Sequence, residues 1–207
     1  FPKEASFVVK AYEDFTLQSA TSIAERFGRD IGHISRVSSV ALEIYDKMKK
    51  LHGYKSRERT LLQVSAILQD IGKYVNVKNH ALLSYNTITN LDIVGINDHE
   101  RLIIATVCYY HNGNIPSMDS PIYNQLSQED RVMVSKLAAI LQISNAINTS
   151  HSPKFEQVSV NMKNGKLNIY LTTLKNINLE KWAFIAKSKL FREVYGLNAT
   201  IIKRGVL

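Results

Sequence analysis

The segment 61–72 constrains the fold of this chain of 207 residues more than any other. Apolar or small side chains at 61, 62 and 64–68 cover most of the circumference of a helix. Such a helix is buried on nearly all sides, so the rest of the chain is expected to pack around it. The helix should end at Asp70-Ile71-Gly72, with Gly72 as a left-handed C-terminal cap. A carboxylate at the end of a buried helix is well placed to hold a cation.

Helical patterns flank this segment on both sides. Asp30 is expected to cap a helix that runs to about residue 50, and Ser19 to cap a short helix over 19–26. In the helix that begins at Asp30, the residues predicted to face inward are Ile34, Val37, Ala41, Ile44, Tyr45 and Met48. Further helices are predicted over about 80–90, 97–110 and 127–149. Residues 1–18 are expected to be an extended connecting segment, followed by a helical domain over 19–152.

The pattern changes at residue 153. Apolar and polar residues alternate on either side of Asn164-Gly165, which predicts a β-hairpin. An amphipathic helix follows, and residues 199–202 form a closing strand. The inward residues of that helix are predicted to be Leu179, Trp182, Ala183, Ala186 and Leu190. The sequence therefore predicts a mainly α protein with a small α+β (ββαβ) domain over 153–207, too small to be stable unless it docks on the helices.

Composition narrows the function classes without selecting one. The 26 Lys and Arg residues exceed the 18 Asp and Glu residues, which gives a formal net charge of +8. This charge suits an acidic partner such as polyphosphate, nucleotide or nucleic acid, or it is an ordinary solvated surface. No run is long enough for a membrane span, so no membrane partner is expected. The single cysteine, Cys108, excludes an internal disulfide and fits a cytoplasmic protein.

Gln69-Asp70 stands where a metal-binding His-Asp pair is found in the HD superfamily of phosphohydrolases, which the segment resembles. In such a site, imidazoles and carboxylates hold a divalent cation that orients phosphate and activates water. His33 matches the upstream histidine, but Gln69 replaces the paired histidine. The late aspartate falls at Asn145 or Asn148. The resemblance therefore implies a degenerate HD site with no catalytic residue, and we expect no bound metal in this chain.

His80 and His111 keep an alternative open. They lie on the helices that follow Asp70, and some HD proteins recruit extra histidine ligands from such positions. With His33 and Asp70, they would form an active, metal-dependent HD phosphohydrolase acting on nucleotide phosphates. The other interpretation is that His80 and His111 are ordinary polar residues at helix ends.

Several runs together point to one family. They are residues 19–27, His33-x-x-Arg36-Val37, Leu51-His52-Gly53, 61–72, 100–111, 136–141 and 145–151. These runs resemble the C-terminal half of the exopolyphosphatase/guanosine pentaphosphate phosphatase (Ppx/GppA) family. The resemblance implies an HD-like helical bundle followed by the ββαβ domain. It also implies that the catalytic glutamate, the phosphate loop and Mg²⁺ belong to upstream phosphatase domains, so that no cofactor is expected in this chain.

The resemblance implies a non-catalytic role for the chain alone. It would bind polyphosphate, form a homodimer, or regulate the phosphatase domains. The residues expected to bind a polyanion are Arg29, Arg36, Lys47, Lys50, Arg57 and Arg59. Arg29 and Arg36 flank His33 in the sequence. Nucleic-acid binding has only the charge in its favour, and the sequence does not distinguish polyphosphate from guanosine pentaphosphate.

Overall fold

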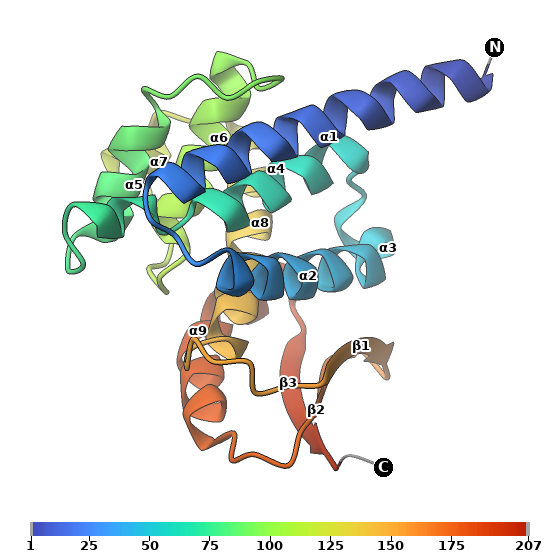
Figure 1. Cartoon of the computed structure of the whole chain (residues 1–207). Coiled ribbons are helices and arrows are strands. Elements are labelled where there is room, and N and C mark those ends of the chain that lie inside the picture. Colours follow the sequence, from blue (N-terminus) through green and yellow to red (C-terminus); the bar gives the residue numbers. More distant parts are fainter. Residues whose placement is uncertain (1, 206–207) are drawn as a thin grey trace.

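The computed structural model describes the backbone of residues 2–205 and the side chains of residues 10–205. The fold is mainly α, with a small three-stranded sheet near the C-terminus (Figure 1). Its helices are α1 (Pro2–Arg26), α2 (Ile31–Lys47), α3 (Lys49–His52), α4 (Ser56–Leu68), the 3-10 helix η1 (Ile71–Tyr74), α5 (His80–Ile88), α6 (Asp98–Tyr110), α7 (Pro121–Asn124), α8 (Gln128–Ile147) and α9 (Asn178–Tyr195). The strands are β1 (Gln157–Lys163), β2 (Lys166–Thr172) and β3 (Asn198–Arg204). None of the helices in the described range is long and apolar enough to cross a bilayer.

The predicted central helix is α4. Its residues from Thr60 to Leu68 are buried except for the half-buried Gln63. Helices α1, α2 and α6 pack against it, and α8 contacts it as well (Figure 1). A helix that is apolar on nearly every side needs this many neighbours, so the prediction from the segment 61–72 is confirmed.

Helix α2 also follows its sequence pattern. The Asp30 side chain accepts hydrogen bonds from the backbone N–H groups of Gly32 and His33, at 2.8 and 3.2 Å. These bonds satisfy two donors that the first turn of a helix leaves free. All the positions that were predicted to face inward are buried. The cap fixes the first turn of the helix, in which His33 is buried.

The prediction of an extended segment over residues 1–18 is wrong. Helix α1 (Pro2–Arg26) is continuous, so Ser19 lies inside it and is not an N-cap. Instead, the Ser19 hydroxyl accepts a hydrogen bond from the backbone N–H of Val94, at 3.1 Å. The buried side chains Thr16, Ala20 and Ile23 follow helical steps of four and three. That spacing continues the helical pattern toward the N-terminus, past the apparent cap.

Gly72 does not form the predicted left-handed cap. Its φ lies outside the left-handed region, and the chain turns through Asp70 into η1. Glycine is needed here for space, because a Cβ atom would collide with the carbonyl oxygen of His80 and with the backbone nitrogen of Ser84. The close approach of η1 to α5 therefore depends on the missing side chain.

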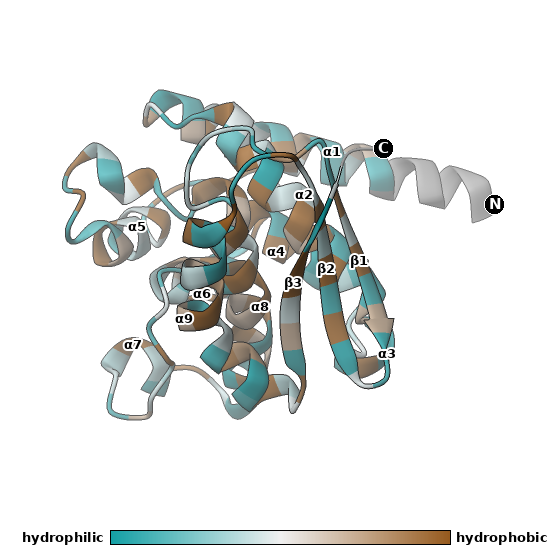
Figure 2. Cartoon of the chain, turned by 90° about the horizontal axis from the view of Figure 1, so that it is seen from below, coloured by the Kyte–Doolittle hydropathy of each residue, from teal (hydrophilic) through white to brown (hydrophobic). Residues whose placement is uncertain are grey.

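The C-terminal part confirms the ββαβ prediction. Strands β1 and β2 form an antiparallel hairpin, and Asn164 and Gly165 have φ values of 52° and 68°. Two positive φ values are what a two-residue type I′ hairpin turn requires. Helix α9 then carries the chain to β3, which pairs parallel to β2. Hydrophobic and hydrophilic residues alternate along the strands (Figure 2), and Leu167, Ile169 and Leu171 of β2 enter the core.

Helix α9 buries only part of the predicted face, since Leu190 is buried and Ala183 is partly buried, whereas Ala186 is exposed. Trp182 is 80% exposed and Leu179 is 53% exposed, whereas Phe184, Leu190 and Phe191 are buried. The prediction that Trp182 belongs to the core is therefore wrong. Apolar residues lie on both sides of this helix, so its pattern does not identify the packed face. The helix packs on α8, and one continuous core joins it to the preceding helices.

Candidate functional site

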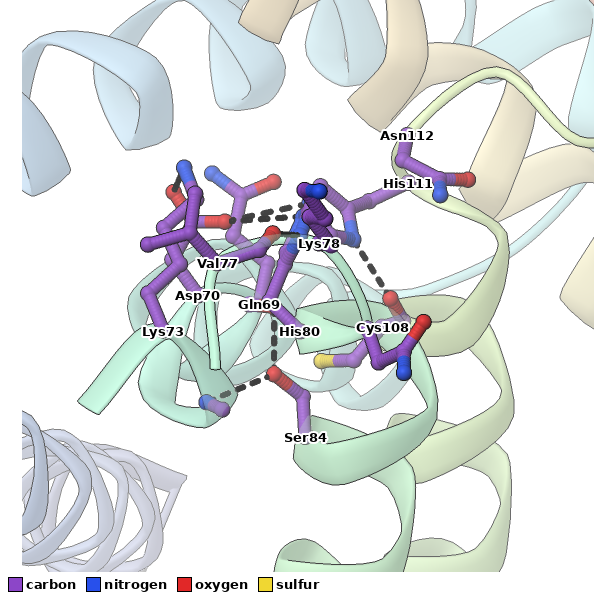
Figure 3. Close-up of polar contacts among 12 residues, drawn as sticks. Gln69, Asp70, Lys73, Val77, Lys78, His80, Ser84, Cys108, His111 and Asn112 are labelled. Carbon is purple, nitrogen blue, oxygen red and sulfur yellow. Dashed lines mark hydrogen bonds and ion pairs between the residues drawn. The ribbon is translucent and has the colours of Figure 1, made fainter. Parts of the chain in front are cut away.

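The turn after α4 places Asp70 where three helical elements meet. The Ser84 hydroxyl, on α5, donates a hydrogen bond to the carbonyl of Gln69 and accepts one from the N–H of Gly72, both at 2.9 Å. These two bonds fasten the turn to α5 (Figure 3). The Asp70 carboxylate is only 5% exposed, so it needs polar partners.

Three side chains supply these partners. The Lys73 ammonium donates to Oδ2 of Asp70 at 2.7 Å. Nε2 of His111 lies 3.2 Å from Oδ1, and Nε2 of His80 lies 3.6 Å from the same oxygen. The two Nε2 atoms are 3.3 Å apart. The structure thus brings together Asp70, His80 and His111, three of the four residues that the sequence analysis named as a possible ligand set (Figure 3).

These neighbours keep Asp70 ionised. Burial acts to raise the pKa of the Asp70 carboxyl, but His111 and Lys73 together hold that pKa well below its usual range. The side chain is therefore a carboxylate at neutral pH. A negative charge at this depth needs a cationic partner, and the Lys73 ammonium is one.

The other residues of the predicted HD set do not join this group. His33 is 3% exposed, and the described part of the chain offers neither of its ring nitrogens a hydrogen-bond partner. Its ring stacks on that of His151, with 4.2 Å between centroids. Gln69 is buried, and Asn148 donates its amide hydrogen to the Ser144 carbonyl within α8, at 3.1 Å. Gln69 is therefore a core residue, and Asn148 is a residue at the end of α8.

A pocket of about 230 Å³ opens beside the Asp70 cluster. Its lining is polar and rich in nitrogen: Lys73, His80, His111, Asn112, Asn145, Thr149, His151 and Lys187. Lys187 comes from α9, and it forms no ion pair within the described residues. The pocket therefore offers an anion two ammonium groups, several imidazoles and amide donors.

Sequence reasoning missed both lysines of this pocket. Lys73 had a local signal, because it follows Asp70 by three residues and a helical turn places such a pair side by side. Lys187 had none, because its position depends on how α9 docks on α8. Asn145 was named as a lost metal ligand, and it lines the pocket instead.

Two of the predicted polyanion-binding residues are committed elsewhere. Arg57 donates to the Glu100 carboxylate at 2.6 Å and to the Gly95 carbonyl at 2.7 Å. Arg59 forms a bidentate salt bridge with Asp46, with N–O distances of 2.8 and 2.9 Å. Both guanidinium groups hold helices together, so they are weaker candidates for an external ligand.

The remaining candidates fall into two groups. Arg36 donates to the carbonyl of His151 at 3.2 Å, next to the pocket, and Arg29 is half-buried without an ion pair among the described residues. Lys47 and Lys50 are exposed at the end of α2 and in α3. Arg36 is therefore bonded to the backbone of a pocket residue, but it lies outside the pocket lining and pairs with Asp30 at 4.0 Å.

We expect His33 to make the stability of the protein depend on pH. Burial, with help from the charge of His151, lowers the pKa of His33 from 6.5 to about 4. The unfolded chain therefore binds more protons between these values, and the free energy of unfolding should fall as pH drops through this window. The largest loss is about 3 kcal/mol. Denaturant unfolding at several pH values should show a shallower slope for His33→Leu than for the parent chain. If the unfolding free energy of His33→Leu changed with pH as steeply as that of the parent chain, this prediction would be contradicted.

The fold and the site define a class: a mainly α domain with a small α+β part, which carries a cationic pocket at a buried carboxylate. Residues 17–190 match the family described as Ppx/GppA phosphatase, domain III. The chain belongs to this family. The family resemblance seen in the sequence is thereby confirmed, together with the mainly α fold class.

Proposed function

We propose that this chain binds a phosphate polymer for an exopolyphosphatase-family protein and does not hydrolyse it alone. One observation carries the proposal: the pocket is lined by Lys187, which has no ion pair among the described residues, and by Lys73, whose ammonium also pairs with Asp70 behind it. Ammonium and imidazole N–H groups are the donors that phosphate oxygens accept from. The formal charge of +8 extends the same preference to the protein as a whole.

The lack of hydrolysis follows from the residues at the predicted HD positions. Phosphoryl transfer needs positioned cations and an oriented water or hydroxyl nucleophile. Gln69, Asn145 and Asn148 carry amides, so they provide neither the imidazole nor the carboxylate that an HD site has at these positions. Hydrolysis is assigned in this proposal to upstream phosphatase domains with their own Mg²⁺, in the cytoplasm. A homodimer remains a prediction.

A second function has one observation in its favour. Asp70, His80 and His111 converge closely enough to hold a metal ion, as an active HD phosphohydrolase would require. In that case the chain alone would release phosphate from a nucleotide or from polyphosphate, and Asp70→Asn would abolish the release.

Binding to labelled long-chain polyphosphate tests the proposal. Affinity should fall steeply with salt, because each neutralised phosphate releases counterions. Lys73→Met/Lys187→Met should weaken binding at least about tenfold, since each lost charge–phosphate contact costs about 1 kcal/mol or more. Lys166→Met, on the exposed hairpin, is the control with the same charge change per site.

Single-stranded DNA at equal charge and salt completes the experiment. Weaker binding to DNA than to polyphosphate supports the proposal, and equal binding would reduce it to general electrostatics. A phosphate-release assay on the same samples should stay at the blank. Release that Asp70→Asn removes would replace this proposal by the HD phosphohydrolase.

A further inference from the structure

The three atoms that converge at Asp70 have the dimensions of a metal site. Oδ1 of Asp70, Nε2 of His80 and Nε2 of His111 are separated by 3.2, 3.6 and 3.3 Å. Tetrahedral Zn²⁺ with bonds of about 2.0–2.2 Å has ligand–ligand edges of about 3.3–3.6 Å. Octahedral Mg²⁺ with bonds of about 2.0–2.1 Å has shorter edges, about 2.8–3.0 Å. The triangle therefore has the size of one face of a zinc tetrahedron.

Hydrogen bonds on the far side of each ring fix where its proton lies. Nδ1 of His80 is 2.8 Å from the carbonyl of Val77, and Nδ1 of His111 is 2.5 Å from that of Cys108. A carbonyl only accepts, so both Nδ1 atoms carry the hydrogen and both neutral rings present a lone pair at Nε2. Metal-ligating histidines typically show this outer bond to a carbonyl.

With both rings neutral, these three lone pairs point at one another and repel. A proton on Nε2 of His111, the state in which His111 lowers the pKa of Asp70, relieves only the edge between those two residues. One additional proton on a ring can bridge only part of the triangle, whereas a divalent ion satisfies all three atoms at once. The second oxygen of Asp70 is already bonded to Lys73, at 2.7 Å. The carboxylate therefore presents Oδ1 alone, as a one-oxygen ligand whose other oxygen is held by a neighbour.

The surroundings suit a fixed site with an entrance. Asp70 and His111 are buried, and the Ser84 bonds fasten the turn that carries Asp70. His80 is less buried and lines the pocket, which gives an ion a path from solvent. Imidazole ligands favour first-row transition ions over Mg²⁺ and Ca²⁺.

We propose that Asp70, His80 and His111 bind one divalent transition-metal ion, best fitted by Zn²⁺. This inference goes beyond polymer binding, which the lysines alone can support. It also departs from the expectation of no metal, because that expectation rests on Gln69, Asn145 and Asn148, and none of these belongs to the ligand set. The rival account is that Lys73 and a protonated His111 neutralise Asp70 by themselves.

Cobalt titration of the chelator-stripped chain tests the proposal. Co²⁺ should bind one per chain with the strong visible absorption of a four-coordinate ion, and Zn²⁺ should displace it. His80→Gln should weaken binding at least about tenfold, since loss of a supporting residue alone costs about that much. His99→Gln, which removes an exposed histidine elsewhere, should bind like the parent chain. No cobalt absorption, or equal absorption in His80→Gln, would overturn the proposal.

A measurement on the unchanged chain guards against misfolded variants. In long-range ¹H–¹⁵N spectra, Zn²⁺ should shift Nε2 of His80 and His111 while their Nδ1 atoms stay protonated, and His99 should not move. Shifts spread over all histidines would overturn the proposal. Zinc binding without polyphosphate binding supports this site and rejects the proposed function, and the reverse result rejects this site alone.

Discussion

Replacing Gly72 by alanine is expected to lower the free energy of unfolding by about 3 kcal/mol or more. The added methyl group would lie 2.5 Å from the backbone nitrogen of Ser84 and 2.9 Å from Cβ of Leu83, and it would also collide with the carbonyl of His80. Backbone atoms cannot rotate out of the way as a side chain can. The 3-10 helix η1 and helix α5 would therefore have to separate, and Asp70 would move away from His80.

Chemical denaturation followed by circular dichroism measures this effect. Gly205→Ala is the matched control, because no atom lies within 4 Å of its added Cβ. The control should stay within about 0.5 kcal/mol of the parent chain. A Gly72→Ala protein as stable as the control would mean that η1 and α5 are not packed as described.

Phe191→Ala is expected to cost about 3–5 kcal/mol of unfolding free energy, because it leaves a large cavity in the core. Phe191 is fully buried on α9, whereas Trp182 on the same helix is 80% exposed. Trp182→Ala should therefore change stability by no more than about 0.5 kcal/mol. The pair tests directly which face of α9 is packed.

The shape of the unfolding curve tests how the two parts of the chain are joined. One core runs through both parts, so the parent chain should unfold in a single transition. The boundary between domains at 152 and 153 remains a prediction. A Phe191→Ala protein that unfolds in two steps, with the helical part surviving the first, would show two independent domains.

The sequence predicted those parts of the fold that local patterns determine. The burial of α4, the inward face of α2 and the turn at Asn164-Gly165 all follow from residues close together in the chain. The errors at Gly72 and α9 have the opposite origin, because each is decided by packing against another element, which residue spacing does not contain. The error at Ser19 differs, since the spacing of Thr16, Ala20 and Ile23 does continue the helix past it.

The candidate site divides in the same way. Asp70 could be named because it ends a buried helix where the HD resemblance places a metal-binding aspartate. His80 and His111 could be named because they begin and end the following helices, where some HD proteins have extra histidine ligands. Lys187 lies more than a hundred residues from Asp70 in the chain. Only the docking of α9 brings Lys187 to the pocket, so no local pattern in the sequence predicts its position there.

The position of Lys187 links ligand binding to the assembly of the protein. The helical part supplies most of the pocket, and α9 of the C-terminal part supplies this one wall. A ligand that needs Lys187 binds only when α9 is packed on α8. The ligand therefore shifts the chain toward the docked state by the difference between its binding free energies for the docked and the undocked state. This coupling is reciprocal: a change that destabilises the docking of α9 weakens ligand binding by the same coupling free energy. Phosphate bound in the pocket would thus report whether the C-terminal part is in place.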